Sequence, residues 1–144
     1  MALAASLGNE KMKELGGKGY LVNAPVAAAT TIYKGARVCA NSSGYVEPVT
    51  VTGAVNYLGR AQEAVDNSAG LDGALNVSIL RGAVTYVPWT SAALTDLGKL
   101  LWFTADDTPT LTPNANIGAA GTVVKVEVGV GVYIDENINA RQVT

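Results

Sequence analysis

Residues 123–135 read VVKVEVGVGVYID, and they give the clearest indication of fold class in the chain. Valine or isoleucine occupies every second position from Val124 to Ile134, with polar residues, glycine and a tyrosine between them. A period of two is typical of a β-strand with one buried face. The stretch fits one long strand or a hairpin folded at Gly129-Val130-Gly131. Because strands average about 5–6 residues, the two glycines favour the hairpin.

The chain before this stretch also reads as short strands separated by turns. β-branched and aromatic runs alternate with clusters of glycine, asparagine, serine and proline. Pro48 removes a backbone donor and so predicts an edge strand or a strand start. Gly82 interrupts the run 75–89 and indicates a bulge, and segment 91–98 indicates a single helical turn. Segment 56–65 fits helix or strand, and strand is favoured.

About eight short strands with turns every 8–12 residues predict an all-β fold, a small barrel or sandwich. A length of 144 residues matches one domain. Residues 1–18 differ from the rest because they are rich in charge and end in glycines. We therefore expect an N-terminal arm over 1–18 and a single β domain over 19–144.

The arm is expected to hold a short helix over Glu10–Leu15, with Asn9 as its cap and Gly16 as its stop. It is either a flexible tail or a segment that orders against a partner. The residues predicted to contact a partner are the apolar side chains of the arm and two nearby aromatics: Leu3, Leu7, Met12, Leu15, Tyr20 and Trp89. Trp89 fits a core position equally well.

Composition excludes several kinds of chemistry. The chain has no histidine and one cysteine, Cys39, so it lacks the commonest general base and cannot form an intrachain disulfide or a cysteine-based metal site. A net charge of −2 gives no broad attraction to nucleic acid. No apolar run reaches the length of a membrane span, and the start lacks the basic region of a targeting signal.

The remaining candidate residues have simpler interpretations. Asp106 and Asp107 are adjacent and fit a turn better than an acid–base pair. Glu63 and Asp66 flank a loop but give only a weak cation signal. Cys39 is expected to be a small buried hydrophobe, and Trp102 a core residue. We therefore expect a protein that is not an enzyme and holds no metal or cofactor.

Several segments, in their order and spacing over about residues 30–135, resemble the decoration (cement) proteins of tailed-bacteriophage heads. The segments that carry the resemblance are 30–38 (TTIYKGARV), 43–45 (SGY), 59–70 (GRAQEAVDNSAG), 81–82 (RG), 94–99 (LTDLGK), 106–107 (DD), 120–124 (AGTVV) and 131–135 (GVYID). The family pattern has an aspartate-rich hairpin before its last segment, whereas residues 126–130 here hold only Glu127. Residues 1–18 fall outside the match.

The resemblance implies a small β-barrel or β-tulip domain that binds the exterior of the expanded icosahedral head. Such proteins tie neighbouring major capsid protein subunits together and stabilise the shell. The resemblance also implies self-association, as a homotrimer, with a dimer or monomer as alternatives. The expected location is the head exterior of the virion, and the host cytoplasm during assembly. Deleting residues 1–17 is then expected to leave the domain folded and to weaken capsid attachment.

Two other function classes remain open at this stage. A carbohydrate- or host-binding β module of a head fibre or tail component would need an exposed aromatic platform, for which Trp89, Tyr45 and Tyr57 are the candidates. A small β-barrel hydrolase would need converging aspartate, lysine and serine side chains in a pocket. Neither class is favoured over a structural role on a phage head.

Overall fold

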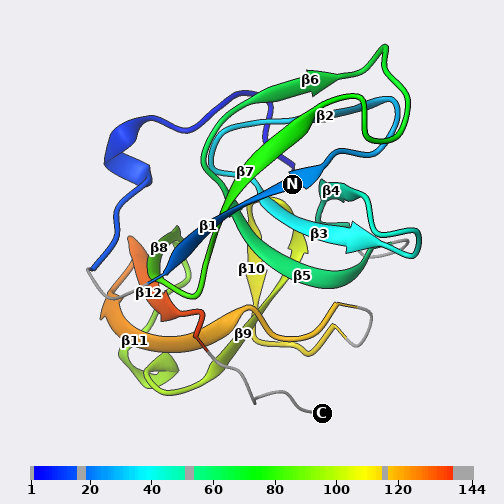
Figure 1. Cartoon of the computed structure of the whole chain (residues 1–144). Helices are drawn as coiled ribbons and strands as arrows, with labels where there is room; N and C mark the ends of the chain where they lie inside the picture. The colour runs from blue at the N-terminus through cyan, green and yellow to red at the C-terminus, as the bar shows by residue number, and fades with distance from the viewer. Residues whose placement is uncertain (1, 16–18, 51–53, 115–116, 138–144) are drawn as a thin grey trace.

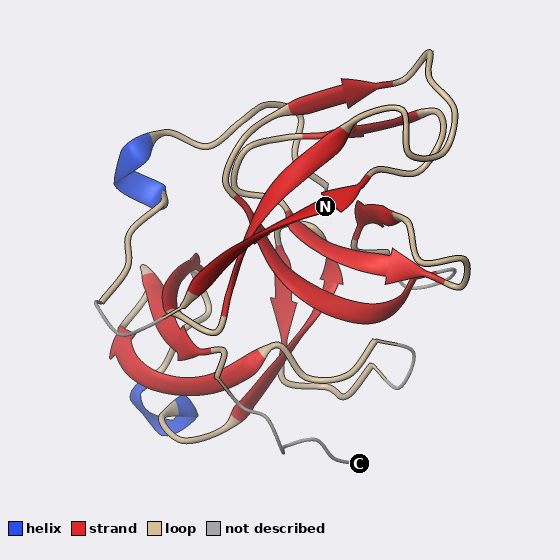
Figure 2. Cartoon of the chain, in the orientation of Figure 1, coloured by secondary structure: helices blue, strands red, loops and turns tan. Residues whose placement is uncertain are grey.

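The computed structural model of the chain describes residues 2–15, 19–50, 54–114 and 117–137. These residues form twelve strands in three antiparallel sheets (Figure 2), and no closed barrel is found among them. The all-β prediction is therefore confirmed, with more strands than the eight expected. The described residues also contain two single 3₁₀ turns, η1 (Asn9–Lys11) and η2 (Leu94–Asp96).

Two sheets have five strands each and the third has two. The first sheet has the order β1 (Tyr20–Pro25), β7 (Asn76–Arg81), β5 (Ala54–Ala61), β3 (Arg37–Asn41) and β4 (Val46–Pro48). The second has the order β10 (Thr108–Thr110), β9 (Leu100–Ala105), β11 (Gly121–Glu127), β12 (Gly131–Asp135) and β8 (Val84–Pro88). The small sheet pairs β2 (Thr30–Ile32) with β6 (Val65–Asn67).

The first sheet lies between the other two and contributes to two separate cores (Figure 1). The inter-sheet core joins it to the second sheet and consists of Cys39, Val49, Val87, Ala92, Leu101, Phe103, Ile117, Ala120, Val123, Val132 and Ile134. The small-sheet core lies on the side of β2 and β6 and consists of Val26, Ile32, Ala36, Val38, Val46, Ala61, Val77 and Ile79.

Strand β3 shows how the sequence serves both cores at once. Successive side chains of a strand point to opposite faces of its sheet. Val38 belongs to the small-sheet core, and its neighbour Cys39 belongs to the inter-sheet core. Arg37, one residue before Val38, therefore shares the face of Cys39 and points toward the second sheet. This alternation places a charged side chain between the two large sheets.

The hairpin predicted within 123–135 is present as β11 and β12, with its turn at residues 128–130. The alternation of buried and exposed side chains is interrupted within the hairpin. Val123 pairs with Ile134, but the next pair is Lys125 with Tyr133, so Val124 is an extra residue that forms a bulge. The bulge reverses the alternation, and Val124 is exposed while Val123 is buried.

Other local predictions meet mixed outcomes. Pro48 ends β4, an edge strand, as predicted, and segment 56–65 is strand up to residue 61. Gly82 does not form a bulge in one long strand. It adopts a φ of 76°, a region that favours glycine, in the turn where the chain leaves β7 of the first sheet for β8 of the second.

The helix expected over residues 10–15 is absent. Only η1 forms, and Gly8 rather than Asn9 precedes it, with no side-chain cap. The Asn9 side chain instead accepts a hydrogen bond from Lys34 Nζ at 3.1 Å. A run of under two turns has little helical stability of its own, and contacts with the β domain determine its conformation.

Candidate functional site

Residues 2–15, the N-terminal segment, lie along the β domain (Figure 1). At its start, the Leu3 amide donates to Asp106 Oδ1 at 2.9 Å. The backbone of Leu7 and the side chain of Ser6 then bind the backbone of Lys34 at 2.8 and 3.0 Å. These contacts anchor the first part of the segment to two loops of the domain.

The end of the N-terminal segment runs beside the outer edge of β8. The Tyr86 amide donates to the Lys13 carbonyl, and the Leu15 amide donates to the Val84 carbonyl, both at 3.1 Å. Glu14 and Thr85 form an antiparallel bridge between them. The segment therefore satisfies backbone groups that an open edge strand would leave unpaired.

Arg60, on β5, holds the N-terminal segment by its side chain. Its guanidinium donates to the carbonyls of Met12 and Lys13, each at 3.2 Å, and to Glu14 Oε2 at 3.0 Å. The side chain is 1% exposed. Burial lowers the pKa of Arg60 to about 10, Arg37 acts in the same direction, and Glu14 opposes both. Arg60 thus remains protonated at neutral pH and binds the segment as a cation.

Arg37 forms a buried network between the two large sheets. Its Nη1 lies 2.6 Å from Glu136 Oε2, and both side chains are almost fully buried. Nη1 also donates to Tyr57 and Thr85 at 3.1 Å, and Nη2 donates to the Tyr86 carbonyl. The Tyr57 and Thr85 hydroxyls in turn donate to the Glu136 carboxylate.

The environment of this network fixes its protonation. Burial raises the pKa of the Tyr57 hydroxyl, so the phenol stays neutral. Burial acts to lower the pKa of Arg37, but Tyr57 and Glu136 outweigh it and the pKa is raised. The Arg37 guanidinium also lies 5.1 Å from the centre of the Phe103 ring. The network is therefore a satisfied ion pair that ties β3 to the chain after β12.

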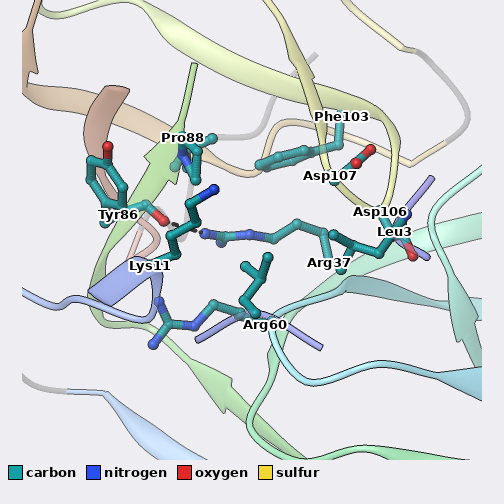
Figure 3. A pocket seen from close by; sticks show the side chains of 12 residues that line it. Leu3, Lys11, Arg37, Arg60, Tyr86, Pro88, Phe103, Asp106 and Asp107 are labelled. Atoms are coloured by element: carbon teal, nitrogen blue, oxygen red, sulfur yellow. Dashed lines mark hydrogen bonds between the residues drawn. The ribbon is translucent and has the colours of Figure 1, made fainter. Parts of the chain in front are cut away.

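A cavity of about 160 Å³ lies beneath the N-terminal segment, next to both arginines. Figure 3 shows the Arg37 guanidinium between Lys11 and Arg60, with Leu3 and Asp106 near the other end of the Arg37 side chain. Burial raises the pKa of the Asp106 carboxyl, partly offset by the Leu3 hydrogen bond. The residues that line the cavity are Leu3, Leu7, Lys11, Gly35, Arg37, Arg60, Tyr86, Val87, Pro88, Phe103, Asp106 and Asp107.

The two buried guanidinium groups beside the cavity bind mainly carbonyl and carboxylate groups of the chain itself. Leu3 packs on the small-sheet core, and Leu7 lies so close to Gly35 that a Cβ there would stand 2.5 Å from Leu7 Cδ1. We therefore interpret the cavity as part of the joint that holds the N-terminal segment on the domain.

Exposed apolar side chains mark a second candidate site. Among the described residues, ten large hydrophobic side chains are exposed, and five of them lie on η2, the residue after it, and the β11–β12 hairpin. These two elements touch, because the Gly98 amide donates to Val123 and the Gly129 amide to Ala92. We call these five residues the hairpin-end patch: Leu94, Leu97, Val124, Val128 and Val130.

The six predicted contact residues lie in different surroundings. Three residues of the arm, Leu3, Leu7 and Met12, are half-buried against the protein's own domain. Leu15 and Tyr20 are exposed. Trp89 is half-buried against the inter-sheet core. None of these six residues belongs to the hairpin-end patch.

The three aromatic candidates for a carbohydrate-binding platform are not among the exposed large side chains. Trp89, Tyr45 and Tyr57 are all half-buried. Tyr57 stacks on Phe103 with 6.0 Å between ring centres, and its hydroxyl serves the Arg37 network. Trp102, expected in the core, is only half-buried, because it points to the opposite face of β9 from the buried Leu101 and Phe103.

The acidic candidates serve turns and loops. Asp106 and Asp107 form the turn between β9 and β10, as predicted. Glu63 accepts a hydrogen bond from the Ser78 amide, and Asp66 accepts one from the Ser68 amide and one from the Thr31 hydroxyl. The bonds from Ser68 and Thr31 lower the pKa of Asp66.

The described residues contain neither a cluster of metal-ligating side chains nor a membrane-spanning helix. No group of three or more aspartate, glutamate, cysteine or histidine side chains there could hold a metal ion. No helix in the described part of the chain has the length and apolar character needed to span a membrane.

The network around Arg37 and the contacts of Arg60 were not predicted from the sequence. One signal was available: Arg37 stands alone in the apolar run 36–40, and a charge in a buried strand requires a partner. Its partner, Glu136, is 99 positions away in the sequence, and no local pattern links them. Arg60 gave no such signal, because two of its four acceptors are backbone carbonyls of the N-terminal segment and a third is Glu14, all 46 to 48 positions away.

No model of a known protein family matches the chain, and no curated protein matches it significantly.

Proposed function

We propose that this protein is a non-enzymatic component of a bacteriophage head that binds the shell's exterior and bridges major capsid protein subunits. The observation that carries the proposal is the ordered set of segments, over about residues 30–135, that resembles capsid decoration proteins. The location that follows is the outside of the virion head, reached from the host cytoplasm during assembly. The barrel-like or tulip-like form of the family belongs to the same proposal.

The hairpin-end patch supports this proposal by offering a surface for the capsid. Exposed apolar residues that cluster on neighbouring elements are typical of interaction sites on otherwise polar surfaces. Val128 and Val130 stand at the tip of the hairpin, where they can enter a groove between capsid subunits. Many equivalent sites on one shell allow each single contact to be modest in area.

The buried joint of the N-terminal segment supports a structural role as well. Arg60 and Arg37 donate hydrogen bonds to other groups of the same chain. Arg60 thereby joins β5 to the N-terminal segment, and Arg37 joins β3 to the residue after β12. Such cross-links rigidify the domain, which suits a protein that must hold neighbouring subunits in fixed positions.

The test is binding of the full-length protein to expanded phage heads that lack it. We expect the protein to sediment with the heads and to saturate at a fixed number of copies. The double variant Val128→Asp, Val130→Asp should bind at least about tenfold more weakly, because it places charge in an apolar contact. The control is Leu71→Asp, an apolar residue outside the patch that is 79% exposed, against 61% and 53% for Val128 and Val130.

Each result has a clear consequence. Wild-type protein that stays in solution while heads sediment would overturn the proposed function. Equal binding by the double variant and the Leu71→Asp control would overturn the assignment of the hairpin-end patch. Raised resistance of decorated heads to heating would support the bridging role.

A further inference from the structure

The outer edge of β1 is left open over most of its length by the described residues. At the other edges, β4, β10, β2 and β6 have three residues each. The five-residue edge strand β8 is covered by residues 13–15. Strand β1 has six residues and pairs only with β7 along its length. On its other side β4 meets the chain just past the end of β1, where Val26 bridges Val46 and the Ala27 amide donates to the Val46 carbonyl. The open part of the edge is therefore residues 20–24.

The sequence of β1 lacks the charge that commonly protects an open edge, and its proline, Pro25, lies at the end of the strand. Its residues, YLVNAP, carry no charge, whereas edge strands that stay monomeric commonly present lysine or another charge. Tyr20 is 57% exposed and Leu21 is 65% exposed. Two more exposed leucines, Leu71 and Leu75, lie in the loop that passes the end of β1, where the Val26 amide donates to the Leu75 carbonyl.

The ladder with β7 determines which backbone groups of β1 point outward. The Val26–Leu75 hydrogen bond continues the β1–β7 register, so Ala24, Val22 and Tyr20 direct their backbone groups toward β7. The backbone groups of Leu21 and Asn23 therefore point outward. Pro25 has the same parity, and there its missing N–H breaks no hydrogen bond with β7.

We propose that β1 is a dimerisation strand and that its partner is β1 of a second copy, antiparallel about Val22. In this register Leu21 lies opposite Asn23 of the second copy, and every outward N–H and C=O of these two residues finds a partner. Shifting the axis to Asn23 would place Leu21 opposite Pro25, whose missing N–H leaves the Leu21 carbonyl unpaired.

The side chains fit the same two-fold arrangement. Tyr20 comes opposite Ala24 of the second copy, which pairs a large exposed ring with a small residue. Because β1 carries no charged residue, no like charges face each other across the two-fold axis. A two-fold edge contact closes with two chains and joins the two first sheets into one. We therefore expect a dimer rather than the trimer that the family resemblance implies. This inference does not rest on the proposed function.

The first test is the mass of the full-length protein in solution over a range of concentrations. We expect a reversible dimer by light scattering or sedimentation equilibrium. Leu21→Lys should weaken dimerisation at least about tenfold, because each dimer then buries two like charges at the edge. Leu97→Lys, at a comparably exposed leucine that follows η2 and lies outside β1, should leave dimerisation unchanged. A wild-type monomer or trimer, or equal effects of the two variants, would overturn the proposal.

The second test fixes the register by cross-linking. In a Cys39→Ala background, Val22→Cys should form a disulfide-linked dimer under mild oxidation, because residue 22 faces itself across a non-hydrogen-bonded pair at about 4.5 Å between Cα atoms. Asn23→Cys, which faces Leu21 instead of itself, should cross-link at least about tenfold more slowly. Faster cross-linking of Asn23→Cys than of Val22→Cys would contradict this register.

Discussion

At the scale of single residues, the most consequential feature is the buried pair of Arg37 and Glu136. Removing a charge from water costs several kcal/mol per ion, and only close pairing and further hydrogen bonds offset it. Here Tyr57 and Thr85 supply those bonds. Removing one charge of the pair should therefore lower the stability of the fold strongly, whereas removing both charges should lower it much less.

We expect Arg37→Met to lower the free energy of unfolding by about 3–5 kcal/mol, because it leaves the buried Glu136 carboxylate without its cation. The double variant Arg37→Met, Glu136→Gln should recover most of that loss, since it removes the unpaired charge as well. Urea denaturation followed by circular dichroism measures both values. Equal destabilisation of the single and double variants would show that packing, not charge, governs the site.

At the scale of elements, the N-terminal segment behaves as part of the domain. It covers the edge of β8, caps Arg60 and packs Leu3 and Leu7 on the domain. We therefore expect its deletion to lower stability as well as to weaken capsid attachment, because it removes the hydrogen bonds to Arg60 and β8 and the packing of Leu3 and Leu7.

Deleting residues 2–15 should therefore lower the free energy of unfolding by about 3 kcal/mol or more, the sum of several hydrogen bonds and two half-buried leucines. The urea midpoint of the truncated chain measures this loss. Leu3→Ala with Leu7→Ala should reproduce part of it, whereas Ala4→Ser with Ala5→Ser, at exposed positions of the same segment, should not. An unchanged urea midpoint for the truncated chain would contradict the inference that the N-terminal segment stabilises the domain.

The elements also show how far the sequence determines the fold. Short-range patterns predicted the hairpin, the edge position of Pro48 and the turn at Asp106, because each depends on neighbours in sequence. The bulge at Val124 was not predictable, because it depends on pairing with Tyr133 and Ile134 across the hairpin. The path of the N-terminal segment depends on Arg60, which is 46 to 48 positions away from its partners.

At the scale of the whole molecule, the first sheet couples two cores. Residues of both large sheets make up the inter-sheet core, while the opposite face of the first sheet supports the small sheet. Unfolding one five-stranded sheet would expose apolar surface of the other. We therefore expect the two sheets to unfold in one cooperative step.

Cys39, the one cysteine of the chain, reports directly on that step because it lies buried between the sheets. Burial raises its pKa to about 12, so almost no thiolate forms at pH 8. A thiol reagent should label the native protein on the order of a thousandfold more slowly than the urea-unfolded chain. Labelling and loss of circular dichroism should share one urea midpoint.

Val124→Cys in a Cys39→Ala background, at an exposed position, should label rapidly without urea. Rapid labelling of native Cys39, or labelling at a lower urea midpoint, would mean that the sheets separate before the fold is lost.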